Sequence, residues 1–145
     1  MGNSKKVKFI VFSLIVIIGL IPIESLVNPE YKLKVVDENL KPLSNVKVYH
    51  TWRYYGLEFQ DHEVEHLSDH NGEVLINRQV IKKNIFSRVF LGVYRIFLIW
   101  NPHISTGPHC YTFAKFGKLR GRVSYNYLEN NTPPKKLLMK ELVKP

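Results

Sequence analysis

Apolar and polar residues alternate along much of the chain between residues 31 and 127, and this pattern predicts β-strands. The clearest stretch covers residues 46–54, where one face of an extended chain carries Val46, Val48, His50, Trp52 and Tyr54. Alternation over residues 110–116 and 121–127, with Gly117 and Lys118 between them, predicts a hairpin. Several short strands with turns at this spacing favour an all-β fold, an antiparallel β-sandwich over residues 28–128.

A long apolar run precedes the predicted sandwich. Lys5, Lys6 and Lys8 come first, and the run 9–23 follows them; this order is typical of a secretory signal. As a helix the run would span about 22 Å, less than the roughly 30 Å of a hydrocarbon core. Residues 1–27 are therefore interpreted as a signal peptide or an uncleaved N-terminal membrane anchor. Either one predicts an exported chain, periplasmic or extracellular.

Residues 81–100 fit two descriptions. Apolar residues at helical spacing, beginning with Ile85, Phe86 and Val89, predict an amphipathic helix inserted into the sandwich. The nearly continuous apolar stretch 91–100 suits a core strand equally well. The last segment, residues 129–145, is basic and contains few apolar residues, so it is interpreted as a flexible or peripheral tail.

Two segments resemble a known family. Residues 35–48 read VVDENLKPLSNVKV and are similar to the opening strand, the x-P-L-x-x-V-x-V turn and the second strand of the carboxypeptidase regulatory-like domain. Residues 68–74, SDHNGEV, are similar to that family's T-D-x-x-G-x-F hairpin, and Asn-Gly is itself a strong hairpin signal. The resemblance covers residues 31–76. It implies a transthyretin-like sandwich, related in architecture to immunoglobulin-like sandwiches, and an accessory, binding or stalk module.

Composition and charge narrow the class of partner. The chain has 145 residues, 45% of them hydrophobic, and one cysteine, which excludes an intrachain disulfide. Its net charge is +9, and residues 78–145 hold thirteen basic residues against two acidic ones. Such a segment attracts nucleic acid, anionic lipid and acidic polymers alike. Because the chain is predicted to be exported, the expected partner is a protein or an envelope polymer, and no nucleic acid.

The segment His62-Glu63-Val64-Glu65-His66 matches the HExxH pattern of zinc peptidases. That chemistry needs a helix, which puts both histidines on one face. Gly56 and the turn at residues 68–72 leave room only for a strand. No catalytic residue or cofactor is therefore assigned, and the chain is not expected to be an enzyme. The alternative is a metal-binding protein in which the strand holds zinc or copper; its candidate ligands are His62, His66, His50 and His70.

Two groups of residues are candidate binding sites. Loops of a β-sandwich commonly carry recognition, which points to a loop contact site at His103, Ser105, Thr106 and His109. Basic residues interleaved with aromatic ones form a second candidate, for an acidic partner or anionic lipid: Lys115, Lys118, Arg120 and Arg122. The predicted function is a non-enzymatic exported binding or accessory module. A further alternative is a membrane-surface protein attached through residues 9–23 or through a basic amphipathic helix at 81–100.

Overall fold

The computed structural model describes residues 2–98, 107–129 and 132–141. The chain divides into two compact units. We call residues 1–25 and 81–104 the helical unit, and residues 26–80 and 105–145 the sandwich unit.

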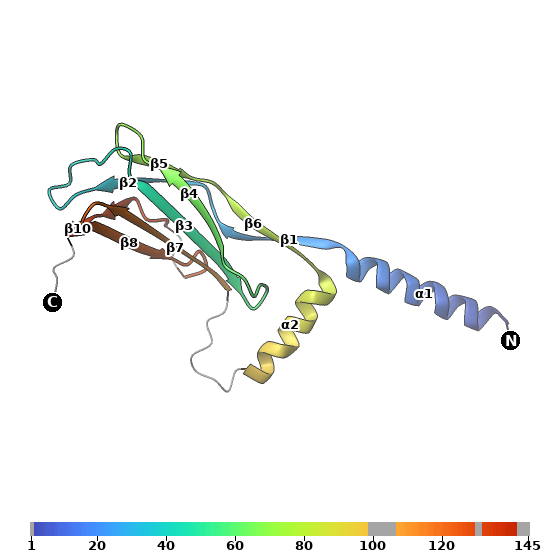
Figure 1. Cartoon of the computed structure of the whole chain (residues 1–145). Helices are drawn as coiled ribbons and strands as arrows, with labels where there is room; N and C mark the ends of the chain where they lie inside the picture. The colour runs from blue at the N-terminus through green and yellow to red at the C-terminus, as the bar shows by residue number, and fades with distance from the viewer. Residues whose placement is uncertain (1, 99–106, 130–131, 142–145) are drawn as a thin grey trace. The chain divides into compact units, whose positions relative to one another are not determined.

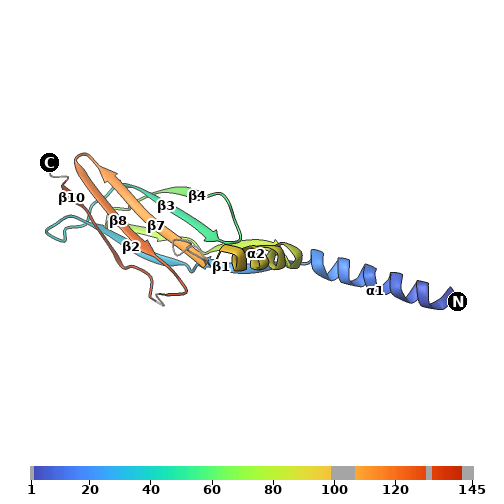
Figure 2. The ribbon, with the colours of Figure 1, turned by 90° about the horizontal axis from the view of Figure 1, so that it is seen from below.

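The described residues of the sandwich unit form two sheets of three or more strands (Figure 1). The larger has the strand order β10-β8-β7-β3-β4; its strands are β3 (Lys47–Tyr55), β4 (His62–Leu67), β7 (Gly107–Phe116), β8 (Leu119–Tyr125) and β10 (Lys140–Glu141). The smaller has the order β5-β2-β9; its strands are β2 (Tyr31–Val36), β5 (Glu73–Ile76) and β9 (Lys136–Leu138). Figure 2 shows β3, β7 and β8 side by side.

Both sheets contribute to one hydrophobic core. Leu33, Val35 and Ile76 of the smaller sheet are fully buried, as is Val48 of β3. Alternate residues of each strand point to opposite faces of a sheet, so the apolar members of the alternating pattern can all lie on the inner face. The prediction of an all-β sandwich is confirmed, and so is the hairpin, formed by β7 and β8.

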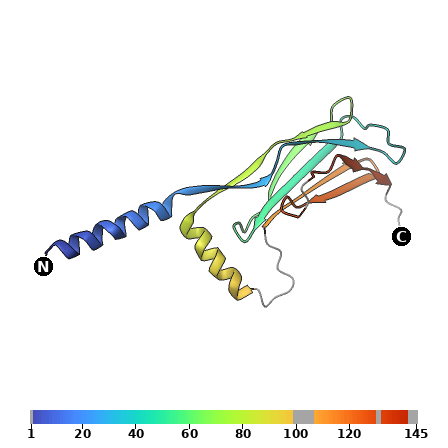
Figure 3. The same ribbon diagram turned by 180° about the vertical axis from the view of Figure 1, so that it is seen from behind.

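The C-terminal segment corrects the prediction of a peripheral tail after residue 128. Strand β9 pairs in parallel with β2, and β10 pairs with β8. Leu137 and Met139 are fully buried in the core, and Figure 3 shows the red C-terminal segment lying against the other strands. A single parallel strand also departs from the purely antiparallel sandwich that was expected.

Short polar side chains form the turns of the two segments that resemble the regulatory-like family. Asp37 Oδ1 accepts hydrogen bonds from the backbone N–H groups of Asn39 and Lys41, at 2.9 and 2.8 Å. Asp69 Oδ1 does the same for Asn71 and Glu73, at 2.9 and 2.7 Å. These are Asx turns, in which the side chain replaces a backbone acceptor.

The Asn-Gly signal lies where it was predicted. Gly72 has a φ of +73°, a conformation that favours glycine. A Cβ at this position would also lie only 2.8 Å from the carbonyl oxygen of Val35. The turn between β4 and β5 therefore depends on a glycine for two separate reasons. The predicted hairpin at this turn is wrong, because β4 pairs with β3 in the larger sheet and β5 pairs with β2 in the smaller one.

The helical unit contains α1 (Gly2–Leu20) and α2 (Ile85–Leu98). Strands β1 (Pro22–Asn28) and β6 (Gln79–Asn84) pair with each other and connect the two units along the chain. The boundary predicted at residue 27 falls inside β1, so the N-terminal segment ends in a paired strand instead of a linker. None of the helices in the described part of the chain is long and apolar enough to cross a membrane.

The amphipathic helix expected within residues 81–100 is confirmed as α2. The alternative of a core strand over 91–100 is wrong for residues 91–98, which are helical, and residues 99–100 lie outside the described residues. The strand β6 ends at Asn84, whose Oδ1 accepts a hydrogen bond from the Ser87 backbone N–H at 2.8 Å. This is the geometry of a helix N-cap. The Arg88 guanidinium then donates to the carbonyl oxygens of Lys83 and Ile23, at 3.2 and 2.6 Å, and so ties the first turn of α2 to both neighbouring strands.

Candidate functional site

The outer face of the five-stranded sheet carries most of the predicted basic patch. In β7, the inner residues Thr112 and Ala114 are buried, whereas Lys115 is exposed. The strand register aligns Lys115 with Lys47 of β3 on one side and with Arg120 of β8 on the other. Arg120 is in turn aligned with Lys140 of β10. Four strands thus contribute one row of four basic residues, which we call the cation row.

One member of the cation row has an acidic partner. Lys47 Nζ lies 2.8 Å from Glu65 Oε1. The hydrogen bond in this pair raises the pKa of Lys47 and lowers the pKa of Glu65. Arg120 Nη1 donates instead to the backbone oxygens of Gly117 and Leu119, both at 2.9 Å. Within residues 2–98, 107–129 and 132–141, no ion pair includes Lys115, Arg120 or Lys140.

Beside the cation row lies a column of aromatic rings. Phe113 stacks on Tyr49 with ring centroids 4.9 Å apart and on Tyr111 at 6.2 Å. The Arg122 guanidinium lies 5.0 Å from the centre of the Tyr111 ring, a cation–π contact. A pocket of about 480 Å³ opens between these groups; Tyr111, Phe113, Ala114, Arg120, Gly121 and Arg122 line it.

Of the four residues in the predicted basic patch, the structure brings Arg120 and Arg122 together at the pocket and places Lys115 in the cation row. Lys118 lies in the β7–β8 turn beside them. Sequence reasoning missed Lys47 and Lys140, which complete the row from distant parts of the chain, and Tyr49 of the aromatic column. The local signal that could have shown that Lys47 and Tyr49 share the outer face of β3 is the alternation of basic and aromatic residues with inner residues over 47–53.

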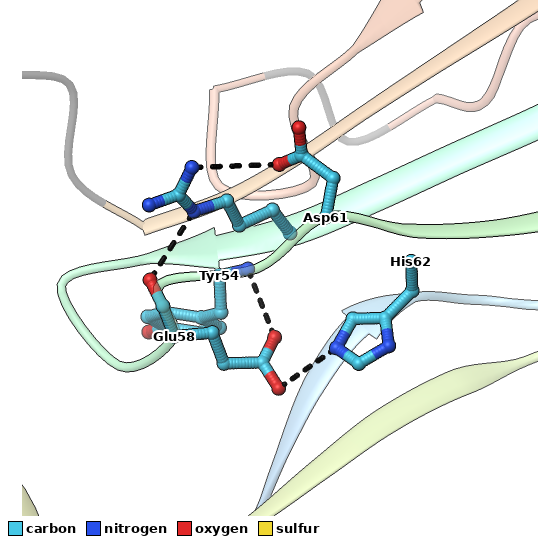
Figure 4. A network of polar contacts seen from close by, with 5 residues as sticks. Tyr54, Glu58, Asp61 and His62 are labelled. Atoms are coloured by element: carbon cyan, nitrogen blue, oxygen red, sulfur yellow. Dashed lines mark hydrogen bonds and ion pairs between the residues drawn. The ribbon is translucent and has the colours of Figure 1, made fainter.

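The β3–β4 loop is held by a separate polar network (Figure 4). Glu58 accepts a hydrogen bond from the Tyr54 backbone N–H at 3.4 Å, and its Oε1 lies 3.1 Å from His62 Nε2. Arg53 donates to the Glu58 carbonyl oxygen at 3.2 Å and lies 3.5 Å from Asp61 Oδ1. The network thus ties the loop to His62, the first residue of β4.

The HExxH segment forms the strand β4, as predicted. His62 and His66 lie four residues apart, about 13 Å along an extended strand, so they cannot share one ion. His62 stacks instead on Trp52 at 5.5 Å, and His70 is exposed in the following turn. No group of three side chains that could hold a metal ion occurs in the described part of the chain. The structure therefore does not bring the four predicted ligands His62, His66, His50 and His70 together at one point.

His50 and His66 are nevertheless close. Their register partners are Val64 and Val48, which makes them diagonal neighbours on the inner face. His50 Nδ1 lies 2.9 Å from Thr112 Oγ1, while the Nε2 atoms of both histidines are buried without a hydrogen-bond partner among the described residues. Burial lowers the pKa of His50 to about 4 and also lowers the pKa of His66. Both imidazoles are therefore neutral at pH 7.

The single cysteine, Cys110, is buried in β7 with a free thiol. Burial raises the pKa of Cys110 to about 12, so almost no thiolate exists at neutral pH. His109, the residue before Cys110, lies on the opposite face of β7. Its ring packs edge-on against the Tyr55 ring, with ring centroids 5.1 Å apart. His109 is the one member of the predicted loop contact site within the described residues; His103, Ser105 and Thr106 lie outside them.

No family model, curated protein or solved structure matches this chain. The resemblance to the regulatory-like domain stays a prediction, and the function has to be argued from the site and the exposed surfaces.

Proposed function

We propose that this chain is an exported, non-enzymatic binding module that lies on the outer surface of a membrane, with α2 in the lipid interface. The export signal is the basic and apolar segment 1–27, and α2 remains in the chain whether or not that segment is removed.

The observation that supports the proposal is the exposed apolar face of α2. Val89 is 58% exposed, Phe90 70% and Ile96 63%. Phe86, Val93 and Tyr94 add to the same half of the helix, since all six residues fall within one 180° sector at 100° per residue. Ser87, Arg88 and Leu91, on the other half, are partly or fully buried. A helix that turns its apolar half outward lowers its free energy by entering a lipid interface.

Basic residues next to α2 fit the same orientation. Lys82 and Lys83 precede the helix, and Lys82 is paired with Glu24 at 3.0 Å. Lysine and arginine side chains near an anionic membrane contribute about 1 kcal/mol each to binding. The expected affinity therefore rises with the anionic lipid content of the membrane.

A fluorophore placed on α2 tests the attachment. Phe90→Cys in the full chain can be labelled selectively with an environment-sensitive dye, because Cys110 is buried and protonated. Adding vesicles of mixed neutral and anionic phospholipid should shift the dye's emission to the blue. Phe59→Cys is the matched control, since Phe59 is 78% exposed in the sandwich unit and its dye should not respond.

Two outcomes would contradict the proposal. An unchanged spectrum at position 90 in vesicle-bound protein would mean that another segment, such as α1, makes the attachment. Equal blue shifts at positions 59 and 90 would mean that the protein adsorbs without orientation. Export is tested separately by fusing residues 1–27 to a phosphatase that is active only outside the cytoplasm.

A further inference from the structure

We propose that the outer face of the five-stranded sheet binds an acidic polysaccharide, with its charged groups along the cation row and one acidic sugar in the Arg120–Arg122 pocket. This ligand would bind whether or not α2 lies in a membrane.

The cation row is the first reason. Like charges directly opposite each other on neighbouring strands destabilise a sheet. Lys115 nevertheless lies between Lys47 and Arg120, and Lys140 follows Arg120. Glu65 offsets only the charge of Lys47. An arrangement that opposes folding in this way indicates that the row serves an anionic partner.

The shape of the row is the second reason. Strands lie about 4.8 Å apart, so four neighbouring strands extend the row over about 14 Å. An extended polymer with repeated charges can contact such a row along its length, whereas a small single anion would use only one or two of its members.

The pocket favours a sugar over a nucleobase. Base recognition on a sheet uses aromatic rings whose faces are open for stacking. Here Phe113 stacks on Tyr49 and Tyr111, and Arg122 covers Tyr111. What the pocket offers instead is two arginines among its lining residues, Arg120 and Arg122. Guanidinium groups bind carboxylate and phosphate groups in a planar, bidentate manner, and an acidic sugar carries such a carboxylate.

The test measures binding of the full chain, held in a non-ionic detergent, to fragments of polygalacturonate. We expect saturable binding at low salt, strong weakening at 0.5 M salt because charges are then screened, and no binding to neutral dextran. The double variant Lys115→Gln/Lys140→Gln removes two exposed members of the row. It should weaken binding at least about 10-fold, since hydrogen bonds to charged groups are the strong ones.

Two further variants make the result specific. Lys41→Gln is the matched control, an exposed lysine in the turn after β2, and should change the affinity less than about 2-fold. Arg122→Lys keeps the charge and loses the planar fork, and should weaken binding clearly while leaving the unfolding midpoint unchanged.

Three results would overturn the proposal. The first is binding of dextran as strong as that of polygalacturonate. The second is an equal loss in the Lys41 variant and in the Lys115/Lys140 variant, which would indicate nonspecific charge attraction. The third is tighter binding of single-stranded DNA or of anionic vesicles through the same residues, which would assign the face to a different ligand class.

Discussion

The two units differ in how far their apolar side chains are buried. In the sandwich unit, Leu33, Val46 and Ile76 are completely buried, whereas in the helical unit Phe9 and Phe90 are 71% and 70% exposed. Burial of apolar surface is the main driving force of folding. The sandwich unit therefore carries the stability of the chain, and the helical unit carries surface available to something else. Substitutions should separate these two roles.

The largest effect is expected in the C-terminal strand. Leu137→Ala removes a fully buried side chain from the core and should lower the free energy of unfolding by about 2–5 kcal/mol. This free energy is measured by denaturant unfolding, with tryptophan fluorescence as the signal. The neighbouring Leu138→Ala is the control, because Leu138 is exposed. A loss below about 0.5 kcal/mol for Leu137→Ala would mean that the strand is peripheral after all.

Ser68→Ala should be the next most damaging change. Ser68 is 2% exposed; its Oγ accepts from the Val46 backbone N–H at 2.9 Å and donates to the Leu43 carbonyl at 2.7 Å. Alanine leaves the buried Val46 N–H without a partner and removes the hydrogen bond to the half-buried Leu43 carbonyl. This should destabilise the protein by about 1–3 kcal/mol. Ser68→Thr keeps the hydroxyl and should recover part of the loss. If Ser68→Ala is neutral in equilibrium unfolding, water must reach both groups.

Acid should destabilise the sandwich unit through His50. Its pKa is about 4 in the folded chain against 6.5 for an ordinary histidine, so the unfolded chain binds a proton first as pH falls. The stabilisation is complete above about pH 6.5 and is lost on the way to pH 4, with a loss of about 2 kcal/mol between pH 7 and pH 5.

The pH dependence has a direct control. His50→Gln should flatten the curve of unfolding free energy against pH, although the half-buried His66 adds a smaller change of the same sign. His70→Gln, in an exposed turn, should leave the curve unchanged. Equal slopes for the wild type and the His50 variant would show that other groups cause the acid sensitivity.

The smallest effect is expected in α2. Gly92 is exposed, and a Cβ there would meet nothing within 4 Å. Gly92→Ala should therefore stabilise α2 by up to about 1 kcal/mol and increase the helix signal in circular dichroism. The unfolding midpoint of the sandwich should stay the same. A shift of that midpoint would show that the two units unfold together.

Local patterns predicted much of the fold. The alternation in residues 46–54 and 110–116, the Asn-Gly turn and the strand conformation of the HExxH segment each depend on neighbours within a few residues, and each is found in the structure. The basic residues of β7 and β8 were also identified from the sequence, because they belong to one hairpin.

What the sequence alone could not determine is how remote strands align. Strand β9 has three residues, too few to show a period, and its place beside β2 depends on a pairing across about a hundred positions of the chain. The cation row joins residues 47, 115, 120 and 140 through the registers of three strand pairs. The close approach of His50 and His66 arises in the same way. Packing of the shared core decides these registers, since a shift of one residue would turn each apolar set toward water.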